Sequence, residues 1–358
     1  MIRSRKMRIL LAENSPFVIK VISDLLQDES EMELCGICKS WPEIMDSLNR
    51  FKPDVLVMSS RLNKSLADEM VREIMIVSPV AILLLCGKEQ SQTEASLRAL
   101  RFGALDIILK PEMPTTFNVE KIGPELLSGI RMAARVRVIR HVETSAQVYV
   151  QRARQRLDQA DPVSPEKAPH ARNVVAIGVS TGGPPVLHTI LASLPPDLPA
   201  ALIIAQHMPG EFVGEFINQL SRNSLLRVAR VEHNLFLREA TAYVAGGDVD
   251  VEITPDGRIR VIPTTGQSNF SPSVNLLFES LSQRTAVGKT GIILTGMGRD
   301  GARGAAELRR SGGTIIVQSP DTCAVSAMPD AIIEARLADY LLPPGAIGPK
   351  IRELIAGH

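Results

Sequence analysis

Short apolar runs alternate with amphipathic segments in the first third of the chain. Five of these runs have the length and continuous apolar character of buried strands, and they cover residues 7–12, 32–37, 54–59, 80–85 and 104–109. The segments between them, such as 17–30 and 93–103, carry apolar residues at helical spacing. Continuous apolar strands that alternate with helices predict a doubly wound parallel sheet.

The same alternation resumes after residue 172. Strand-like runs there cover residues 174–179, 201–206, 241–246, 290–296 and 314–318. Residues 247–263 alternate in polarity around Asp256-Gly257, a pair that favours a tight hairpin turn. A second doubly wound α/β domain that carries a hairpin is therefore predicted.

A segment of different character separates the two patterns. Residues from 129 onward keep a helical but weakly apolar pattern, and residues 161–172 add three prolines among polar residues. A chain of 358 residues is also long for a single core. We therefore expect a first domain over 1–128, a helical and proline-rich linker over 129–171, and a second domain over 172–358.

Composition narrows the classes of function. The 40 Lys and Arg residues balance 39 Asp and Glu, which gives no case for nucleic acid as a partner. The apolar stretch near the N-terminus ends at Glu13, too early for a signal peptide, and no apolar run reaches the ~20 residues that span a membrane. A soluble cytoplasmic protein with no membrane insertion is the expectation.

The cysteines do not indicate a cofactor. Cys35 and Cys38 have the spacing of redox or zinc sites, but a strand-like stretch places side chains three apart on opposite faces. No second cysteine pair is present to complete a zinc site. No metal and no cofactor are expected.

The candidate chemistry lies at the ends of three strands in the second domain. Ser180 follows the strand at 174–179 within Gly-Val-Ser-Thr-Gly, a turn that fits a nucleophile elbow, an anion-binding loop or a purely structural turn. His207 and Asp300 follow two other strands, and the carboxyl ends of parallel strands share one edge of a sheet. A serine, a base and an acid at one edge favour a hydrolytic triad, although a structural histidine and a turn aspartate remain alternatives.

Five motifs together resemble the chemotaxis response regulator protein-glutamate methylesterases, the CheB family, over nearly the whole chain. They are IGVSTGGP at 177–184, QHMP at 206–209, SPSVNLLF at 271–278, LTGMGRDGA at 294–302 and TCAVSAMP at 322–329. The resemblance implies a flavodoxin-like receiver domain followed by a Rossmann-like methylesterase domain. It also implies Ser180, His207 and Asp300 as the catalytic residues.

The implied reaction is hydrolysis of glutamate γ-methyl esters on chemoreceptor helices, and such enzymes also deamidate certain receptor glutamines. Backbone amides around Thr181, Gly182 and Met297 are the expected oxyanion or substrate-binding groups. A methylated chemoreceptor is the expected partner, with a chemosensory kinase or adaptor as a second candidate. The alternatives are a non-catalytic signalling module and a phosphate binder, which would leave His207 and Asp300 without a role.

The second domain departs from the family pattern in three places. The usual Ala-Pro-Gly-Asp segment is Ala-Gly-Gly-Asp at 245–248, without the following histidine. Ser271 and Asn275 stand where Arg and Asp are usual, and Ala327 replaces a glycine. The triad is retained, so these changes bear on substrate contacts and efficiency.

The first domain lacks most of the chemistry of a receiver. The acidic pair falls on Glu13 and Asn14, the phosphoacceptor on Ser59 and the hydroxyl position on Cys86, while Lys110 is retained. Mg²⁺ prefers oxygen ligands that include one or two carboxylates, and a serine cannot form an acyl phosphate. A pseudo-receiver is therefore predicted, with an unusual phosphorylation supported by Glu13 and Ser59 as the alternative.

Overall fold

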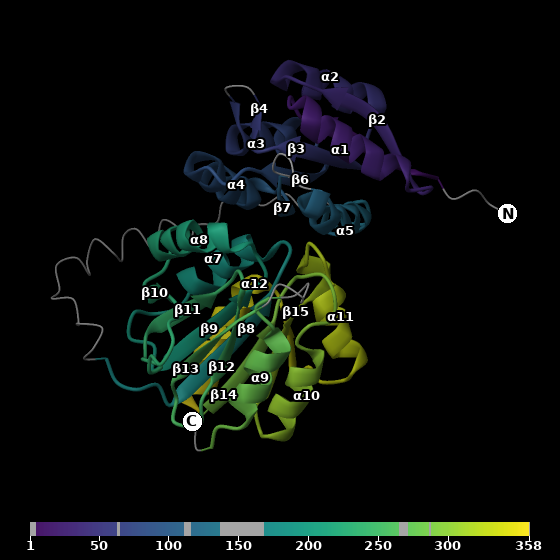
Figure 1. Ribbon diagram of the computed structural model, residues 1–358. Helices are drawn as coiled ribbons and strands as arrows, with labels where there is room; N and C mark the ends of the chain where they lie inside the picture. Colours follow the sequence, from purple (N-terminus) through teal and green to yellow (C-terminus); the bar gives the residue numbers. More distant parts are fainter. Residues whose placement is uncertain are drawn as a thin grey trace. The chain divides into compact units, whose positions relative to one another are not determined.

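The computed structural model describes residues 5–62, 65–110, 116–136, 168–264, 271–285 and 288–357, with backbone alone for 116–122. It divides into two compact units, Met1–Val142 and Glu143–His358 (Figure 1). Each unit is built around its own parallel sheet, which confirms the predicted fold class.

The first unit holds a five-stranded parallel sheet with the strand order β2-β1-β3-β6-β7. The strands are β1 (Met7–Ala12), β2 (Met32–Cys38), β3 (Val55–Ser59), β6 (Ala81–Cys86) and β7 (Asp106–Leu109). All five were predicted, with bounds that differ by no more than two residues. This order is the flavodoxin-like one, in which ligands bind where the strand order reverses.

Four helices connect these strands, α1 (Pro16–Gln27), α2 (Trp41–Phe51), α3 (Ala67–Val77) and α4 (Gln90–Phe102), and α5 (Thr116–Ala133) follows β7. A short antiparallel pair, β4 (Arg61–Leu62) and β5 (Ser65–Leu66), follows β3. Helix α1 shows how the local sequence sets an element. The Ser15 hydroxyl accepts the Val18 amide at 3.4 Å, and Pro16 occupies the first turn, where its missing N–H costs nothing.

The second unit holds a seven-stranded parallel sheet with the order β10-β11-β9-β8-β14-β15-β16. The strands are β8 (Asn173–Val179), β9 (Ala200–Gln206), β10 (Arg227–Arg230), β11 (Thr241–Ala245), β14 (Gly288–Ile293), β15 (Thr314–Gln318) and β16 (Tyr340–Leu342). Central β8 has β9 on one side and β14 on the other, so the strand order reverses there. In open α/β sheets this switch point is where a ligand crevice forms, at the carboxyl ends of the strands.

The helices of this unit are α7 (Gly183–Ala192), α8 (Gly210–Arg222), α9 (Val274–Ser282), α10 (Ala302–Arg310), α11 (Ala327–Glu334) and α12 (Pro344–Ala356). Helices α9 and α10 lie side by side (Figure 1). The predicted hairpin is confirmed as β12 (Val249–Ile253) and β13 (Ile259–Pro263), with Gly257 at a φ of 90° in its turn. None of the described helices is long and apolar enough to cross a bilayer.

The predicted linker lies largely outside the described residues, which omit 137–167. Helix α5 continues to Ala133, past the predicted end of the first domain at residue 128. The position of that domain boundary stays a prediction. At the other end, the amide of Ala171 donates to Leu237, and that of Glu239 donates to Pro169. The chain before β8 is thus hydrogen-bonded to the body of the second unit.

A tight contact between β8 and α9 gives a test of this packing. A Cβ on Gly178 would lie 2.3 Å from Cγ1 of Val274, so we expect Gly178→Ala to destabilise the second unit by about 1–3 kcal/mol. Gly214→Ala is the matched control, because nothing lies within 4 Å of its Cβ position in α8, and alanine should stabilise that helix by about 0.5–1 kcal/mol. Urea unfolding measures both, and equal effects would contradict the packing.

Candidate active site

Ser180 lies in the turn between β8 and α7. Its amide donates to the Thr295 carbonyl at 3.0 Å, and the residue is 8% exposed. Gly182 caps α7 with a φ of 75°, and a Cβ there would lie 2.5 Å from that of Ala324. Only glycine meets both demands, which explains the glycine two residues after the serine.

His207 follows β9, the neighbour of β8. The register pairs Val179 with Gln206, so Ser180 and His207 are the next residues on two adjacent strands. The His207 amide donates to the Val179 carbonyl at 3.0 Å, which continues this pairing. Adjacent strands lie ~4.8 Å apart, and this spacing places the two residues side by side at the carboxyl edge.

Asp300 completes the cluster from the loop that follows β14. Its Oδ2 lies 3.1 Å from Nε2 of His207, and the side chains of the two residues are 7% and 9% exposed. Oδ2 also accepts the Val274 amide at 2.7 Å, and Oδ1 accepts the Asn275 amide at 3.0 Å. The carboxylate therefore bridges the histidine ring and the N-terminus of α9, where the helix dipole favours negative charge.

The charge of Asp300 is stabilised by these donors. Burial alone would raise the pKa of this carboxyl, since a charge loses solvation in the interior. The hydrogen bonds from His207, Val274 and Asn275, together with the His207 charge, outweigh burial and hold the pKa below its usual value. Asp300 is consequently an anion at neutral pH and can fix the orientation of the ring.

Asn275 has a structural role at this place. Its side-chain oxygen accepts the Gly304 amide of α10 at 2.9 Å, while its own amide donates to Asp300. A Cβ on Gly304 would lie 2.6 Å from the Asn275 carbonyl, so α9 and α10 approach closely there. The residue that replaces the usual aspartate thus supports the cradle of Asp300.

Three buried polar side chains, to which the sequence alone assigned no role, hold the Ser180 turn. Gln206 Nε2 donates to the Ser180 carbonyl at 3.3 Å, and Gln318 Oε1 accepts the Thr295 amide at 2.9 Å. The Thr295 hydroxyl lies 3.0 Å from the Thr181 carbonyl. All three residues are at most 2% exposed. Polar residues at the ends of otherwise apolar strands were the available signal.

The residues expected to stabilise an oxyanion lie around this turn. Thr181 and Gly182 directly precede α7, and Met297 follows Gly296. A Cβ on Gly296 would lie 2.7 Å from that of Ser180, so the Met297 segment passes next to the serine. Their role in binding stays a prediction.

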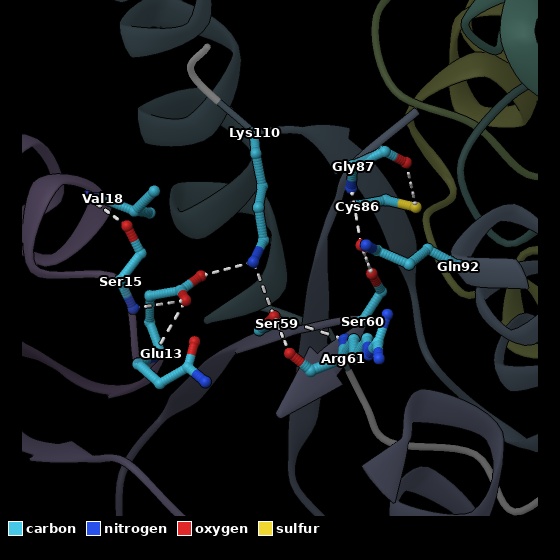
Figure 2. Close-up of polar contacts among 11 residues, drawn as sticks. Glu13, Ser15, Val18, Ser59, Ser60, Arg61, Cys86, Gly87, Gln92 and Lys110 are labelled. Atoms are coloured by element: carbon cyan, nitrogen blue, oxygen red, sulfur yellow. Dashed lines mark hydrogen bonds and ion pairs between the residues drawn. The ribbon is translucent and has the colours of Figure 1, made fainter. Parts of the chain in front are cut away.

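Figure 2 shows the corresponding edge of the first unit, where Lys110 lies between Glu13 and Ser59. The Lys110 ammonium is 2.7 Å from Glu13 Oε2 and donates to the Ser59 hydroxyl, also at 2.7 Å. Glu13 is fully buried, and its Oε1 accepts the amides of Asn14 and Ser15. The negative charge of Glu13 is therefore balanced by the ammonium of Lys110.

Cys86 completes this edge without adding charge. Its thiol lies 3.2 Å from the Ser96 hydroxyl, and burial raises the pKa of the thiol. Cys35 and Cys38 are free thiols on β2. Among the described residues, no group of three or more His, Cys, Asp or Glu side chains is placed to hold a metal ion.

Comparison with known proteins gives consistent names. A family model described as CheB methylesterase matches residues 175–351. A Pyrococcus abyssi protein named protein-glutamate methylesterase/protein-glutamine glutaminase is 32% identical over 95% of this chain and 91% of its own length. A Geobacillus kaustophilus protein of the same name is 30% identical over 98% and 99%. The crystal structure of the Thermotoga maritima CheB methylesterase catalytic domain is 33% identical, covers 51% of this chain and 99% of that one, and has a TM-score of 0.47.

The lowered pKa of Asp300 predicts a pH-dependent contribution to stability. A carboxylate whose pKa is lower in the folded state stabilises the fold above its unfolded pKa, and loses this contribution as the pH falls through the folded pKa. We expect Asp300→Asn to cost about 1–3 kcal/mol above about pH 5 and progressively less below about pH 4.

Urea unfolding at a series of pH values measures this difference. Asp197→Asn, the same change at an exposed loop position, is the control and should change stability by less than about 0.5 kcal/mol. A deficit in Asp300→Asn that stays constant from about pH 5 to about pH 3 would contradict the assignment.

Proposed function

The chain belongs to the protein-glutamate methylesterase/protein-glutamine glutaminase family, and on this premise we propose that its second unit hydrolyses γ-methyl esters of glutamate side chains in a protein. The observation that carries the proposal is the buried His207–Asp300 hydrogen bond beside the Ser180 turn. Similarity over nearly the whole length favours hydrolysis over a non-catalytic signalling module. It also confirms the resemblance to the CheB family.

The first half of the reaction forms an acyl-enzyme. His207 Nε2 faces Asp300, so Nδ1 is the nitrogen that we assign to accept the Ser180 proton. The Ser180 oxygen attacks the ester carbonyl carbon, and a tetrahedral oxyanion forms. The C–O bond to the methoxy group then breaks, and the His207 proton leaves with that group as methanol.

The second half releases the product. A water molecule gives a proton to His207 and attacks the acyl carbon, and the bond to Ser180 breaks as the proton returns to the serine oxygen. The product is a glutamate carboxylate. A glutamine substrate follows the same path, with ammonia as the leaving group in place of methanol.

The surrounding groups stabilise the charges that develop. Asp300 holds the imidazole in one orientation and stabilises the imidazolium. We assign the amides of Thr181, Gly182 and Met297 to the oxyanion, where one donor contributes about 3–4 kcal/mol. No step in this scheme requires a metal or a cofactor.

The substrate that fits this chemistry is a methylated chemoreceptor helix in the cytoplasm. An ester on a folded protein has to reach a serine that is only 8% exposed. An extended side chain that projects from a helix can enter such a turn. A chemosensory kinase or adaptor is the second proposed partner, and it would contact the first unit.

The first unit is proposed to be a pseudo-receiver. A reversible phosphorylation switch needs an acceptor carboxylate and a bound Mg²⁺, whereas here Ser59 occupies the acceptor position. Glu13, the remaining acid, is paired with Lys110 at 2.7 Å. A cation entering the site would have to displace this partly buried ammonium from Glu13, so aspartyl phosphorylation should not control the enzyme.

Substitution of the proposed nucleophile tests the enzyme. We expect Ser180→Ala to lower kcat for methanol release from methylated receptor membranes by about 10⁴–10⁶, because removal of one triad member disables the unit. Ser282→Ala, whose hydroxyl bonds within its own helix, should retain the wild-type rate. Equal rates for Ser180→Ala and wild type would refute the proposed function.

Binding of a phosphoryl analogue tests the pseudo-receiver. We expect Mg²⁺ with beryllofluoride to leave the Tm of the wild-type protein unchanged, because the acceptor carboxylate is absent. The combined variant Asn14→Asp, Ser59→Asp, Cys86→Thr restores the receiver residues and should gain a Mg²⁺-dependent rise in Tm. Stoichiometric beryllofluoride binding by the wild type would show that the site is functional.

A further inference from the structure

Thr295 contacts three segments of the active-site edge, although the reaction scheme gives it no role. It is fully buried just beyond the end of β14. Its carbonyl accepts the Ser180 amide at 3.0 Å, and its amide donates to Gln318 at 2.9 Å. Its hydroxyl lies 3.0 Å from the Thr181 carbonyl and 3.1 Å from the Val325 carbonyl, and it accepts the Val325 amide at 3.0 Å.

One consequence concerns the source of the oxyanion donors. The Ser180 amide is committed to the Thr295 carbonyl, so the nucleophile's own N–H is directed into the protein. A donor for the oxyanion therefore has to come from another peptide unit. The next two amides along the turn are those of Thr181 and Gly182.

The orientation of the Gly182 amide follows from peptide geometry. A trans peptide unit is planar, and its C=O and N–H point in opposite directions. The Thr181 carbonyl and the Gly182 N–H belong to the same unit. Because that carbonyl is the nearer of the two that the Thr295 hydroxyl contacts, at 3.0 Å, the Gly182 N–H is directed away from Thr295.

This peptide unit needs a restraint because of its sequence. Rotation of a peptide unit by half a turn changes ψ of the preceding residue and φ of the following one. Gly182, with its φ of 75°, tolerates either sign of φ, so little intrinsic strain opposes such a rotation. The contact with Thr295 opposes it, since rotation would take the Thr181 carbonyl away from the hydroxyl in a buried turn.

We propose that Thr295 is a positioning residue for the esterase reaction, whose hydroxyl fixes the Thr181–Gly182 peptide unit so that the Gly182 N–H is presented to the tetrahedral oxyanion. The proposal rests on the function proposed above. It assigns the role to the hydroxyl and not to the methyl group of Thr295. The side chain itself does not touch the substrate.

Kinetics of three variants at this position test the proposal. Thr295→Val keeps the shape but removes the hydroxyl, and we expect kcat for methanol release to fall about 10²-fold, with KM nearly unchanged, as for the loss of an oxyanion donor. Thr295→Ser keeps the hydroxyl and should retain most of the wild-type kcat. Thr295→Ala removes the hydroxyl without inserting a misplaced methyl group, and it serves if the valine variant does not fold.

A second readout separates positioning from a general loss of structure. Phenylboronic acid forms a tetrahedral anionic adduct with a reactive serine, so its inhibition constant reports on the oxyanion donors. The constant should rise for Thr295→Val by about the same factor as kcat falls, after correction for the folded fraction measured by circular dichroism. Thr295→Ser should leave it close to the wild-type value.

The outcomes separate this inference from the function beneath it. A wild-type kcat in Thr295→Val, a change in KM alone, or an equal loss in Thr295→Ser would overturn the positioning role. In each of these cases, loss of activity in Ser180→Ala would still support the proposed esterase function. An active Ser180→Ala would instead remove the proposed function itself.

Discussion

The candidate site of the second unit depends on the hydrogen bonds that the buried Asp300 carboxylate accepts. An ion this deeply buried is tolerated only where donors replace the lost water, and here His207 and two amides of α9 do so. The same bonds connect the end of β9 to α9 and, through Asn275, to α10. Folding stability and the orientation of the imidazole ring therefore rest on one set of contacts.

The first unit also contains a buried carboxylate, that of Glu13, but its partner there is a lysine. Glu13 is fully buried at the carboxyl edge of its sheet, and its charge is matched by Lys110. The ammonium also donates to the Ser59 hydroxyl, which in turn donates to the Arg61 carbonyl. In the second unit we propose that the carboxylate orients a histidine that acts on a neighbouring serine, whereas in the first the carboxylate is paired with a lysine.

Much of the fold could be predicted because buried parallel strands read as continuous apolar runs. Two edge strands were not predicted. Two of the four residues of β10 (Arg227–Arg230) are charged, and β16 is only three residues long, so neither forms a continuous apolar run of strand length. Strand ends pointed to Ser180, His207 and Asp300 because the carboxyl edge is shared. The α9 cradle and the Thr295 contacts could not be predicted, as they join segments 23 to 115 residues apart. The linker prediction falls mostly on residues 137–167, outside those described.

The most direct test of the central claim is a double-mutant cycle in kcat for methanol release. The cycle compares wild type, Ser180→Ala, Asp300→Asn and the double variant. If Asp300 acts only through His207 on Ser180, each single change costs about 10⁴ or more and the double variant is no slower than Ser180→Ala. Independent, multiplicative losses, or a wild-type rate in Asp300→Asn, would contradict the account.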